Sequence, residues 1–440
     1  MILDLLKTRR FAPLFWSQMF SSFNDNLVRN MLAMMILFRV GAEQAGPLVT
    51  LALGVFILPS IVLSGLGGQI ADSHDKAQVA RWLKVAELGV QVLAAVGFWF
   101  TSIVTLYVVL FMLGVIATLY TPVKYGIMPD HLRRDELTAG NALVEGAGFV
   151  AILLGLVAGG LTGLEGVSKP AVVAELVCVA LACVVSTWFI PSTEPAAPNL
   201  RLGRNLFGST FSLVTDIRRD PRLWVGSVGS SWFWLSGSVT LALVPVIVKQ
   251  RIGGGVEVET AISLFFALGV GIGSLLAGFL SRGRISLKHV PWSVAFMGIF
   301  LIDAGIATAH LGDAREQLSL GEFLHSGLGI RVALDLTGLA CAGGLFSVPV
   351  FAAVQSWASA DHRARVVAGV GVLNALYIVA GSAVTAFLQM PWIGVPNPVL
   401  LLALGAANLG AAVYFHKRLP DPDAAAAGYV PDEASARPGE

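Results

Sequence analysis

Near-continuous apolar runs recur along this 440-residue chain from Phe11 to His416. A helix of about 20 apolar residues is long enough to cross the roughly 30 Å hydrocarbon layer of a membrane. Only 13% of the residues are charged and the mean hydropathy is +0.76, whereas soluble domains carry about 25% charged residues. These values exclude a soluble enzyme, a disordered chain and a nucleic-acid-binding protein. They predict an all-α polytopic membrane protein.

Twelve of these runs are long enough to form transmembrane helices. The predicted spans are 12–38, 47–70, 83–100, 102–123, 138–162, 170–190, 223–248, 260–281, 289–310, 331–357, 366–390 and 394–416. With a cytoplasmic N-terminus, 21 of the 29 Lys and Arg residues fall in cytoplasmic segments, five on the opposite side and three within spans. Because cytoplasmic loops carry the excess of positive charge, we expect both termini in the cytoplasm.

The longest polar interruption, 191–222, is rich in proline and arginine and separates six spans from six. We therefore expect two pseudo-symmetric six-helix bundles. The expected parts are an N-terminal bundle at 1–190, a cytoplasmic linker at 191–222, a C-terminal bundle at 223–418 and a disordered cytoplasmic tail at 419–440. Paired six-helix repeats are typical of carriers that rock two bundles about a central site.

Four motifs lie within the first 165 residues. They are Phe23-Asn24-Asp25-Asn26, Gly68-Gln69-Ile70-Ala71-Asp72-Ser73, Thr121-Pro122-Val123-Lys124-Tyr125-Gly126-Ile127, and Asn141-Ala142-Leu143-Val144-Glu145 running into Ala151-Ile152-Leu153-Leu154-Gly155. With six plus six spans and a glycine-to-aspartate loop after the second, the chain resembles the major facilitator superfamily. The four motifs together resemble the bacterial lysophospholipid transporter family. Ser73-His74-Asp75 departs from the superfamily pattern, in which Arg-x-Gly is common.

The resemblance implies a flippase that moves lysophospholipids such as lysophosphatidylethanolamine from the outer to the inner leaflet of the bacterial inner membrane for re-acylation. In some relatives an acyltransferase and an acyl-carrier-protein synthetase follow on the same chain. This chain stops at Glu440, so we expect separate enzymes to act on the product. The alternative function is a proton-coupled efflux carrier for amphipathic drugs, with Asp25 carrying the proton. No catalytic, nucleotide-binding or metal-ligand spacing is present, so we expect no cofactor and no metal.

An ionisable group at the bilayer centre costs about 2.5–3.5 kcal/mol on insertion scales, and therefore faces protein or water. Asp25 lies midway along the first predicted span beside Asn26 and Asn30, and Arg29 follows on the same helical face. There are two alternatives. Either this face lines a cavity, where Asp25 binds a headgroup ammonium and Arg29 binds a phosphate, or the two residues form an ion pair that needs no other partner.

Two further pairs are candidates for substrate binding. Lys124, after a helix-breaking Pro122, and Glu145 in the fifth span are expected to come within reach of each other, as a phosphate site or as a salt bridge of the inner gate. For Trp232 and Trp234 in the seventh span there are two alternatives: they form the wall along which an acyl chain lies, or they pack between helices.

Four other charged residues are candidates for gating. The superfamily resemblance implies that Asp72, with Lys76 in the same loop, holds the outward-facing state against a helix of the second half; a solvated loop charge is the alternative. Arg331 and Asp335 are four residues apart near the outer end of the tenth span and are expected to form an outer-gate or structural pair. Asp303 in the ninth span has no partner that the sequence identifies.

Overall fold

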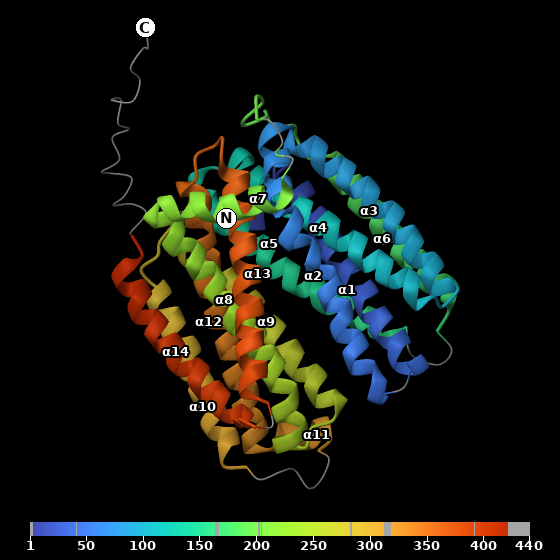
Figure 1. The fold of residues 1–440 in the computed structure, drawn as a ribbon, viewed down its shortest axis with the longest axis vertical. Coiled ribbons are helices and arrows are strands. Elements are labelled where there is room, and N and C mark those ends of the chain that lie inside the picture. Colours follow the sequence, from blue (N-terminus) through green and yellow to red (C-terminus); the bar gives the residue numbers. More distant parts are fainter. Residues whose placement is uncertain are drawn as a thin grey trace.

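The structure is a computed structural model that describes residues 3–40, 42–162, 167–200, 203, 205–281, 284–311, 318–390 and 392–420. The predicted tail therefore lies outside the described residues from 421 onward. Two groups of six long helices form two bundles (Figure 1). The first bundle contains α1 (Ala12–Val40), α2 (Ala42–Ser73), α3 (Lys76–Trp99), α4 (Ile103–His131), α5 (Leu137–Leu161) and α6 (Lys169–Trp188). The second contains α8 (Pro221–Ile247), α9 (Val256–Ser281), α10 (Val290–Ala309), α12 (Gly327–Trp357), α13 (Arg363–Leu388) and α14 (Asn397–Arg418).

Short helical segments connect or precede these helices. They are η1 (Leu3–Lys7), η2 (Arg134–Glu136), α7 (Leu206–Arg219), η3 (Val248–Ile252) and α11 (Leu320–His325). The predicted linker 191–222 thus contains a helix, α7, which packs across α2 and α13. In Figure 1, α7 lies across the end of the molecule that also holds η1 and the last turn of α14, called here the termini end. The two bundles diverge from there toward the end that holds α11.

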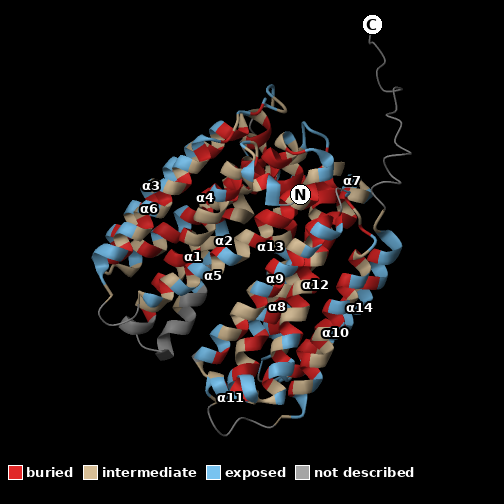
Figure 2. Ribbon diagram, turned by 180° about the vertical axis from the view of Figure 1, so that it is seen from behind, coloured by how far each residue is buried: buried red, intermediate tan, exposed pale blue. Residues whose placement is uncertain are grey.

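Ten of the long helices are long and apolar enough to cross a membrane. The other two, α1 and α3, carry more polar and charged residues but pack within the same bundle. Large apolar side chains such as Val104, Trp292 and Leu334 are exposed, with 74%, 68% and 65% of their surface accessible, and exposed residues cover the outer faces of the helices (Figure 2). Apolar side chains face outward where hydrocarbon replaces water, and the predicted two-bundle helical fold is confirmed.

One predicted helix end is wrong. The fourth span was expected to end at residue 123 because proline breaks helices, yet α4 continues through Pro122 and Pro129 to His131. Transmembrane helices tolerate proline because neighbouring helices and side chains satisfy the freed backbone groups. Lys124 consequently lies inside α4 and not in a loop after it.

Glycines bring helices into backbone contact within each bundle. Gly155 and Gly159 of α5 lie against the backbone of α1 at Phe23 and Leu27. In the second bundle, Gly269 and Gly273 of α9 lie against the backbone of α12, where Gly273 contacts the Cys341 carbonyl. Small residues permit such close packing between transmembrane helices, and they fix the helices that position the central residues.

The glycine contacts predict a local stability cost for added side-chain volume. Gly273→Ala places a methyl group against a backbone carbonyl that cannot rotate away, and we expect the free energy of unfolding to fall by about 1–3 kcal/mol. Gly237→Ala on α8 is the matched control, because apart from its chain neighbours and the adjoining backbone of α8 no described atom lies within 4 Å of its added Cβ. We expect the control to be neutral or stabilising by up to about 1 kcal/mol. Thermal unfolding of the purified protein in detergent measures both; equal melting temperatures for the two variants would contradict the packing argument.

Candidate substrate cavity

A cavity of about 250 Å³ lies between the two bundles. The first bundle contributes Gln18, Ser22, Thr121, Lys124, Tyr125, Val144, Glu145, Gly148, Phe149 and Ile152 to its wall. The second bundle contributes Ser230, Phe233, Trp234, Ser347, Phe351, Val367, Val370, Gly371 and Asn374. Three of the predicted substrate-binding residues, Lys124, Glu145 and Trp234, therefore line one cavity.

Tyr125 connects the two charged residues of the cavity wall. Its hydroxyl donates a 2.6 Å hydrogen bond to Glu145 Oε1, and the Lys124 ammonium lies 4.3 Å from the centre of its ring. No direct ion pair joins Lys124 to Glu145 within 4.0 Å in this described part of the chain. Lys124 is 92% buried, so its charge lacks a close counter-ion and remains available to an anionic group of a ligand.

Asp25 is half-buried and makes no hydrogen bond or ion pair with any described residue. Its electrostatic neighbours are Lys84, Glu87, Arg29 and Lys124. Lys84 Nζ bonds to Glu87 Oε2 at 2.6 Å and to Ser21 Oγ at 2.7 Å, and it lies 3.7 Å from the centre of the Tyr120 ring. Lys84 and Glu87 therefore form an ion pair near Asp25, whereas the Asp25 carboxylate has no ion-pair partner among the described residues.

Of the two alternatives for Asp25 and Arg29, the ion pair is not formed within 4.0 Å among the described residues, although the two groups interact electrostatically. Arg29 donates a 3.3 Å hydrogen bond to Asn26 Oδ1, and its guanidinium lies 4.5 Å from the centre of the Phe56 ring on α2. The cation is stabilised by this aromatic face of the next helix. Asn30 donates to the Leu156 carbonyl on α5. Asp25, Asn26, Arg29 and Asn30 are absent from the described cavity wall.

The two tryptophans of α8 point in different directions. Trp234 is 39% exposed and lines the cavity. Trp232 instead donates its indole N–H to Asn408 Oδ1 on α14 at 3.0 Å, so it packs inside the second bundle and does not form a wall for substrate. Residues two apart on a helix differ by about 200° in direction, which excludes a shared cavity face.

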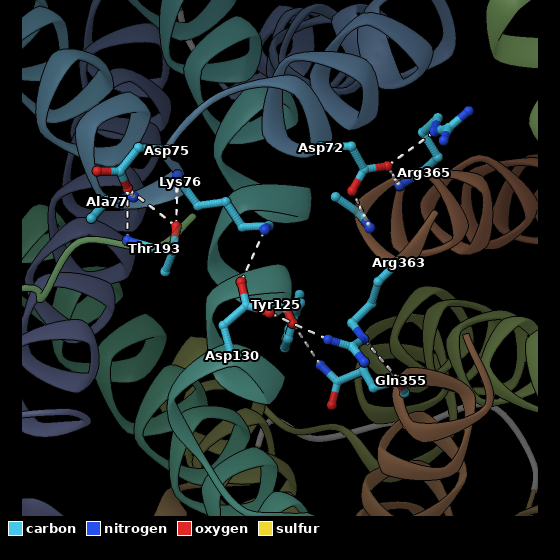
Figure 3. A network of polar contacts seen from close by, with 11 residues as sticks. Asp72, Asp75, Lys76, Ala77, Tyr125, Asp130, Thr193, Gln355, Arg363 and Arg365 are labelled. Carbon is cyan, nitrogen blue, oxygen red and sulfur yellow. Dashed lines mark hydrogen bonds and ion pairs between the residues drawn. The ribbon is translucent and has the colours of Figure 1, made fainter. Parts of the chain in front are cut away.

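Asp72 joins the two bundles at the termini end (Figure 3). Its carboxylate accepts hydrogen bonds from the backbone N–H groups of Ala364 at 3.0 Å and Arg365 at 3.2 Å, and from Arg365 Nε at 3.0 Å. These N–H groups open α13, so the anion also meets the positive end of the helix dipole. Gly68, one turn earlier on α2, lies against the Arg365 backbone and permits this approach.

A second set of contacts between the bundles centres on Asp130. Lys76 Nζ lies 2.9 Å from Asp130 Oδ2, and Arg363 from the second bundle lies 3.3 Å from Asp130 Oδ1. Gln355 of α12 adds two hydrogen bonds, accepting from Asn141 at 2.6 Å and donating to the Tyr125 carbonyl at 3.2 Å. Figure 3 shows how Asp130 and Gln355 bridge the two bundles around Arg363.

The departure from the superfamily loop pattern has a structural explanation. Asp75 caps the N-terminus of α3 by accepting from the Ala77 N–H at 2.9 Å, and it also accepts from the Thr193 N–H at 3.0 Å (Figure 3). Partial burial would raise the pKa of Asp75, but the hydrogen bonds from Thr193 and Ala77 outweigh it and hold the pKa below its usual value. Asp75 thus fastens the segment after α6 to the loop between α2 and α3.

Comparison with known proteins identifies the family to which this chain belongs. The family model for the Major Facilitator Superfamily matches residues 14–333. The chain belongs to the major facilitator superfamily. Among solved structures of this fold, the human organic anion transporter MFSD10 superposes with a TM-score of 0.68 at 15% identity, covering 92% of this chain and 99% of that one. A bacterial homologue of the iron transporter ferroportin superposes with a TM-score of 0.65 at 16% identity, covering 93% and 100%.

Within the superfamily, the chain is similar to relatives that are named lysophospholipid transporters. The lysophospholipid transporter LplT of Citrobacter koseri is 28% identical over 347 residues, which cover 77% of this chain and 78% of the relative. The protein of the same name from Yersinia enterocolitica is 27% identical over 311 residues, covering 70% and 74%. The chain spans a smaller share, 65%, of the homologue from Serratia proteamaculans, at 26% identity.

The predicted pair of Arg331 with Asp335 is not formed. Arg331 of α12 makes a bidentate ion pair with Asp303 of α10, with Nε–Oδ2 at 2.9 Å and NH2–Oδ1 at 2.5 Å. It does not pair with Asp335, whose Oδ2 is buried without a hydrogen-bond partner in the described residues. The sequence identified no partner for Asp303, and the structure shows that its partner is Arg331 of the neighbouring helix α12.

Several residues of the site were missed by sequence reasoning. Two of them, Tyr125 and Asn374, line the cavity. The others make contacts between the bundles at the termini end: Asp130, Gln355 and Arg363. Tyr125 follows Lys124 within a motif already singled out, so its ring and hydroxyl could have been considered. Gln355 near the end of one long apolar run and Asn374 inside another are polar residues, which is the available signal.

The contacts at the termini end predict a shift in conformation when one is removed. Asp130→Asn deletes the carboxylate that Lys76 and Arg363 share, and we expect roughly a tenfold rise in the population open at this end. A cysteine at Ala364, in a background without the native cysteines, reports the opening through its rate of alkylation by a maleimide. Ala364 is fully buried in this structure, in which the two bundles are joined at the termini end.

The matched control for this prediction is Asp216→Asn on α7. Asp216 pairs with Arg219 at 3.0 Å on the exposed surface and joins no helix of the other bundle, so the same change of charge should leave the alkylation rate unchanged. An unchanged rate in Asp130→Asn, or an equal rise in both variants, would count against a role for Asp130 in closing this end.

Proposed function

We propose that this protein is a lysophospholipid transporter of the bacterial inner membrane that moves single-chain phospholipids from the outer to the inner leaflet by alternating access. The observation that carries the proposal is the central cavity, whose first-bundle wall presents a buried cation and a carboxylate, Lys124 and Glu145, and whose opposite wall presents Phe233, Trp234 and Phe351. The relatives named as lysophospholipid transporters support the same substrate class.

The charges of the first bundle suit a zwitterionic headgroup. Three carboxylates and three cations lie at the cavity or directly behind its wall: Asp25, Glu87, Glu145, Arg29, Lys84 and Lys124. The set is neutral in sum, so a ligand with one negative and one positive group enters without leaving a net buried charge. Lys124 receives the phosphate and Glu145 receives the ammonium, while the Asp25 carboxylate, which is outside the wall but interacts electrostatically with Lys124, adds to the charge balance of the site.

The acyl chain has an adjoining apolar path. A second pocket of about 180 Å³ lies between α2, α4 and α13, and it shares Thr121, Val367 and Gly371 with the central cavity. Phe56, Ile57 and Pro122 contribute its apolar surface. The headgroup lies in the polar cavity while the tail extends through this pocket toward the hydrocarbon, which avoids moving a charged group through lipid.

The contacts of Asp72 and Asp130 support an outward-facing state. Positive charge is concentrated in the segments at the termini end, so this end faces the cytoplasm. The bundles are joined there and diverge at the opposite end (Figure 1), which is the outward-facing state. Release to the inner leaflet requires these contacts to break while the opposite ends close. The cycle involves no covalent chemistry, and separate enzymes re-acylate the product.

One observation favours a second function. The unpaired Asp25 carboxylate could carry a proton in a proton-coupled efflux carrier for amphipathic drugs. Cells with and without the gene, compared for susceptibility to amphipathic drugs and for lysophospholipid uptake, separate the two functions. Uptake that depends on the gene, with unchanged susceptibility, supports the lipid transporter; the reverse pattern supports efflux.

Substitution of the headgroup residues tests the proposal directly. Asp25→Asn and Lys124→Met each remove one of the charges assigned to a zwitterion, and we expect uptake of labelled lysophosphatidylethanolamine into spheroplasts to fall by at least about tenfold, since a charged hydrogen bond contributes about 1.5–3 kcal/mol. Protein abundance in the membrane is measured alongside uptake.

Lys169→Met is the matched control. Lys169 opens α6 far from the cavity wall and donates to the Trp99 carbonyl at 3.2 Å on the exposed surface, so its replacement should leave uptake unchanged. Normal uptake in both Asp25→Asn and Lys124→Met would refute the assigned headgroup site.

A further inference from the structure

The two walls of the central cavity differ in chemistry. Both charged residues of the wall, Lys124 and Glu145, belong to the first bundle. The polar groups that the second bundle contributes are neutral: Ser230 of α8, Ser347 of α12 and Asn374 of α13. The second wall therefore offers hydrogen bonds without charge, in a position opposite the groups assigned to the headgroup.

The neutral groups of the second wall have unused hydrogen-bonding capacity. Ser230 and Ser347 make no hydrogen bond with any residue that the structure describes, although Ser230 is 96% buried. In the first wall, by contrast, Gln18 bonds to Ser22 at 2.8 Å and Thr121 bonds to the Ala117 carbonyl at 2.8 Å. Both serines line the cavity, so their hydroxyls are available there to a partner other than the protein.

Asn374 is positioned by a buried serine. The Ser231 hydroxyl, which is fully buried, lies 2.9 Å from Asn374 Oδ1 and 2.9 Å from the Ser227 carbonyl, so the two acceptors share its single proton. The contact with Ser231 occupies one end of the Asn374 amide and leaves the other end to the cavity that Asn374 lines. Together with the two serine hydroxyls, which both donate and accept, the wall can satisfy a ligand hydroxyl as donor and as acceptor.

We propose that Ser230, Ser347 and Asn374 bind the free hydroxyl of the glycerol backbone, with Ser231 as the positioning residue, and thereby select single-chain over diacyl phospholipids. This rests on the proposed function. In a lysophospholipid the free hydroxyl is next to the phosphate ester along the glycerol, so it faces this wall when the phosphate is at Lys124. In a diacyl lipid an ester replaces the hydroxyl, which removes the donor and adds a second chain.

The experiment compares two lipids that differ by one oxygen atom. Uptake of labelled 1-palmitoyl lysophosphatidylethanolamine is measured beside that of its 2-deoxy analogue, the palmitoyl ester of 1,3-propanediol phosphoethanolamine, with the full-length protein in spheroplasts. We expect the native protein to take up the 2-deoxy analogue about tenfold less efficiently, as the loss of one or two neutral hydrogen bonds predicts. Equal uptake of the two lipids would overturn the proposal without any variant being made.

A variant then assigns the discrimination to the second wall. Asn374→Leu should lower uptake of the natural lipid about tenfold, to the level of the 2-deoxy analogue, and leave uptake of the analogue within about twofold of the native value. Gln389→Leu, which removes an exposed amide at the end of the same helix, should preserve the full discrimination.

Two results separate failure of this proposal from failure of the proposed function. Equal losses for both lipids in Asn374→Leu would show a purely structural role for the side chain and overturn the assignment. Absence of uptake of either lipid by the native protein would overturn the proposed function itself, and the hydroxyl site with it.

Discussion

The energetic cost of placing charge inside a membrane protein determines much of this structure. Lys84 and Glu87 form an ion pair at 2.6 Å, and Ser21 and the Tyr120 ring complete the surroundings of the ammonium. Lys124 and Asp25 have no such direct partner. A buried charge without a counter-ion is costly and is retained where a ligand or a change of state can supply one. The contrast between paired and unpaired charges in one bundle therefore distinguishes the scaffold from the proposed substrate site.

Contacts within the bundles and contacts between them are of different kinds. Inside each bundle, glycines bring helix backbones together, as Gly155 does for α5 and α1 and Gly273 does for α9 and α12. At the termini end, Gly68 also brings α2 close to the Arg365 backbone, but the bundles are joined there in addition by hydrogen bonds and ion pairs that converge on Asp72 and Asp130. Backbone packing resists separation, whereas polar side-chain contacts can exchange for water. The fold is therefore suited to motion of two rigid bodies about the cavity.

The sequence predicts the helices well because hydrophobic runs report membrane depth directly, and it predicts side-chain partners poorly because these depend on neighbouring helices. The i,i+4 rule suggested pairs for Arg29 and Arg331, but Phe56 on α2 and Asp303 on α10 are closer partners across helix contacts. Trp232 and Trp234 could not share a face, which helical geometry alone would have shown. Pro122 misled the helix boundary because the rule that proline ends helices applies less strictly in membranes.

The unequal division of charge between the cavity walls has a consequence for transport. Both charged residues of the wall belong to the first bundle, so in the proposed function the headgroup remains bound to one rigid body while the second bundle moves. The second wall contributes neutral hydrogen bonds and aromatic surface, and neutral hydrogen bonds contribute less than charged ones. Rocking therefore breaks and remakes the weaker set of contacts at each half-cycle. This arrangement keeps the ligand bound through the occluded state without requiring a strong ionic contact to be broken at the moment when the bundles exchange open ends.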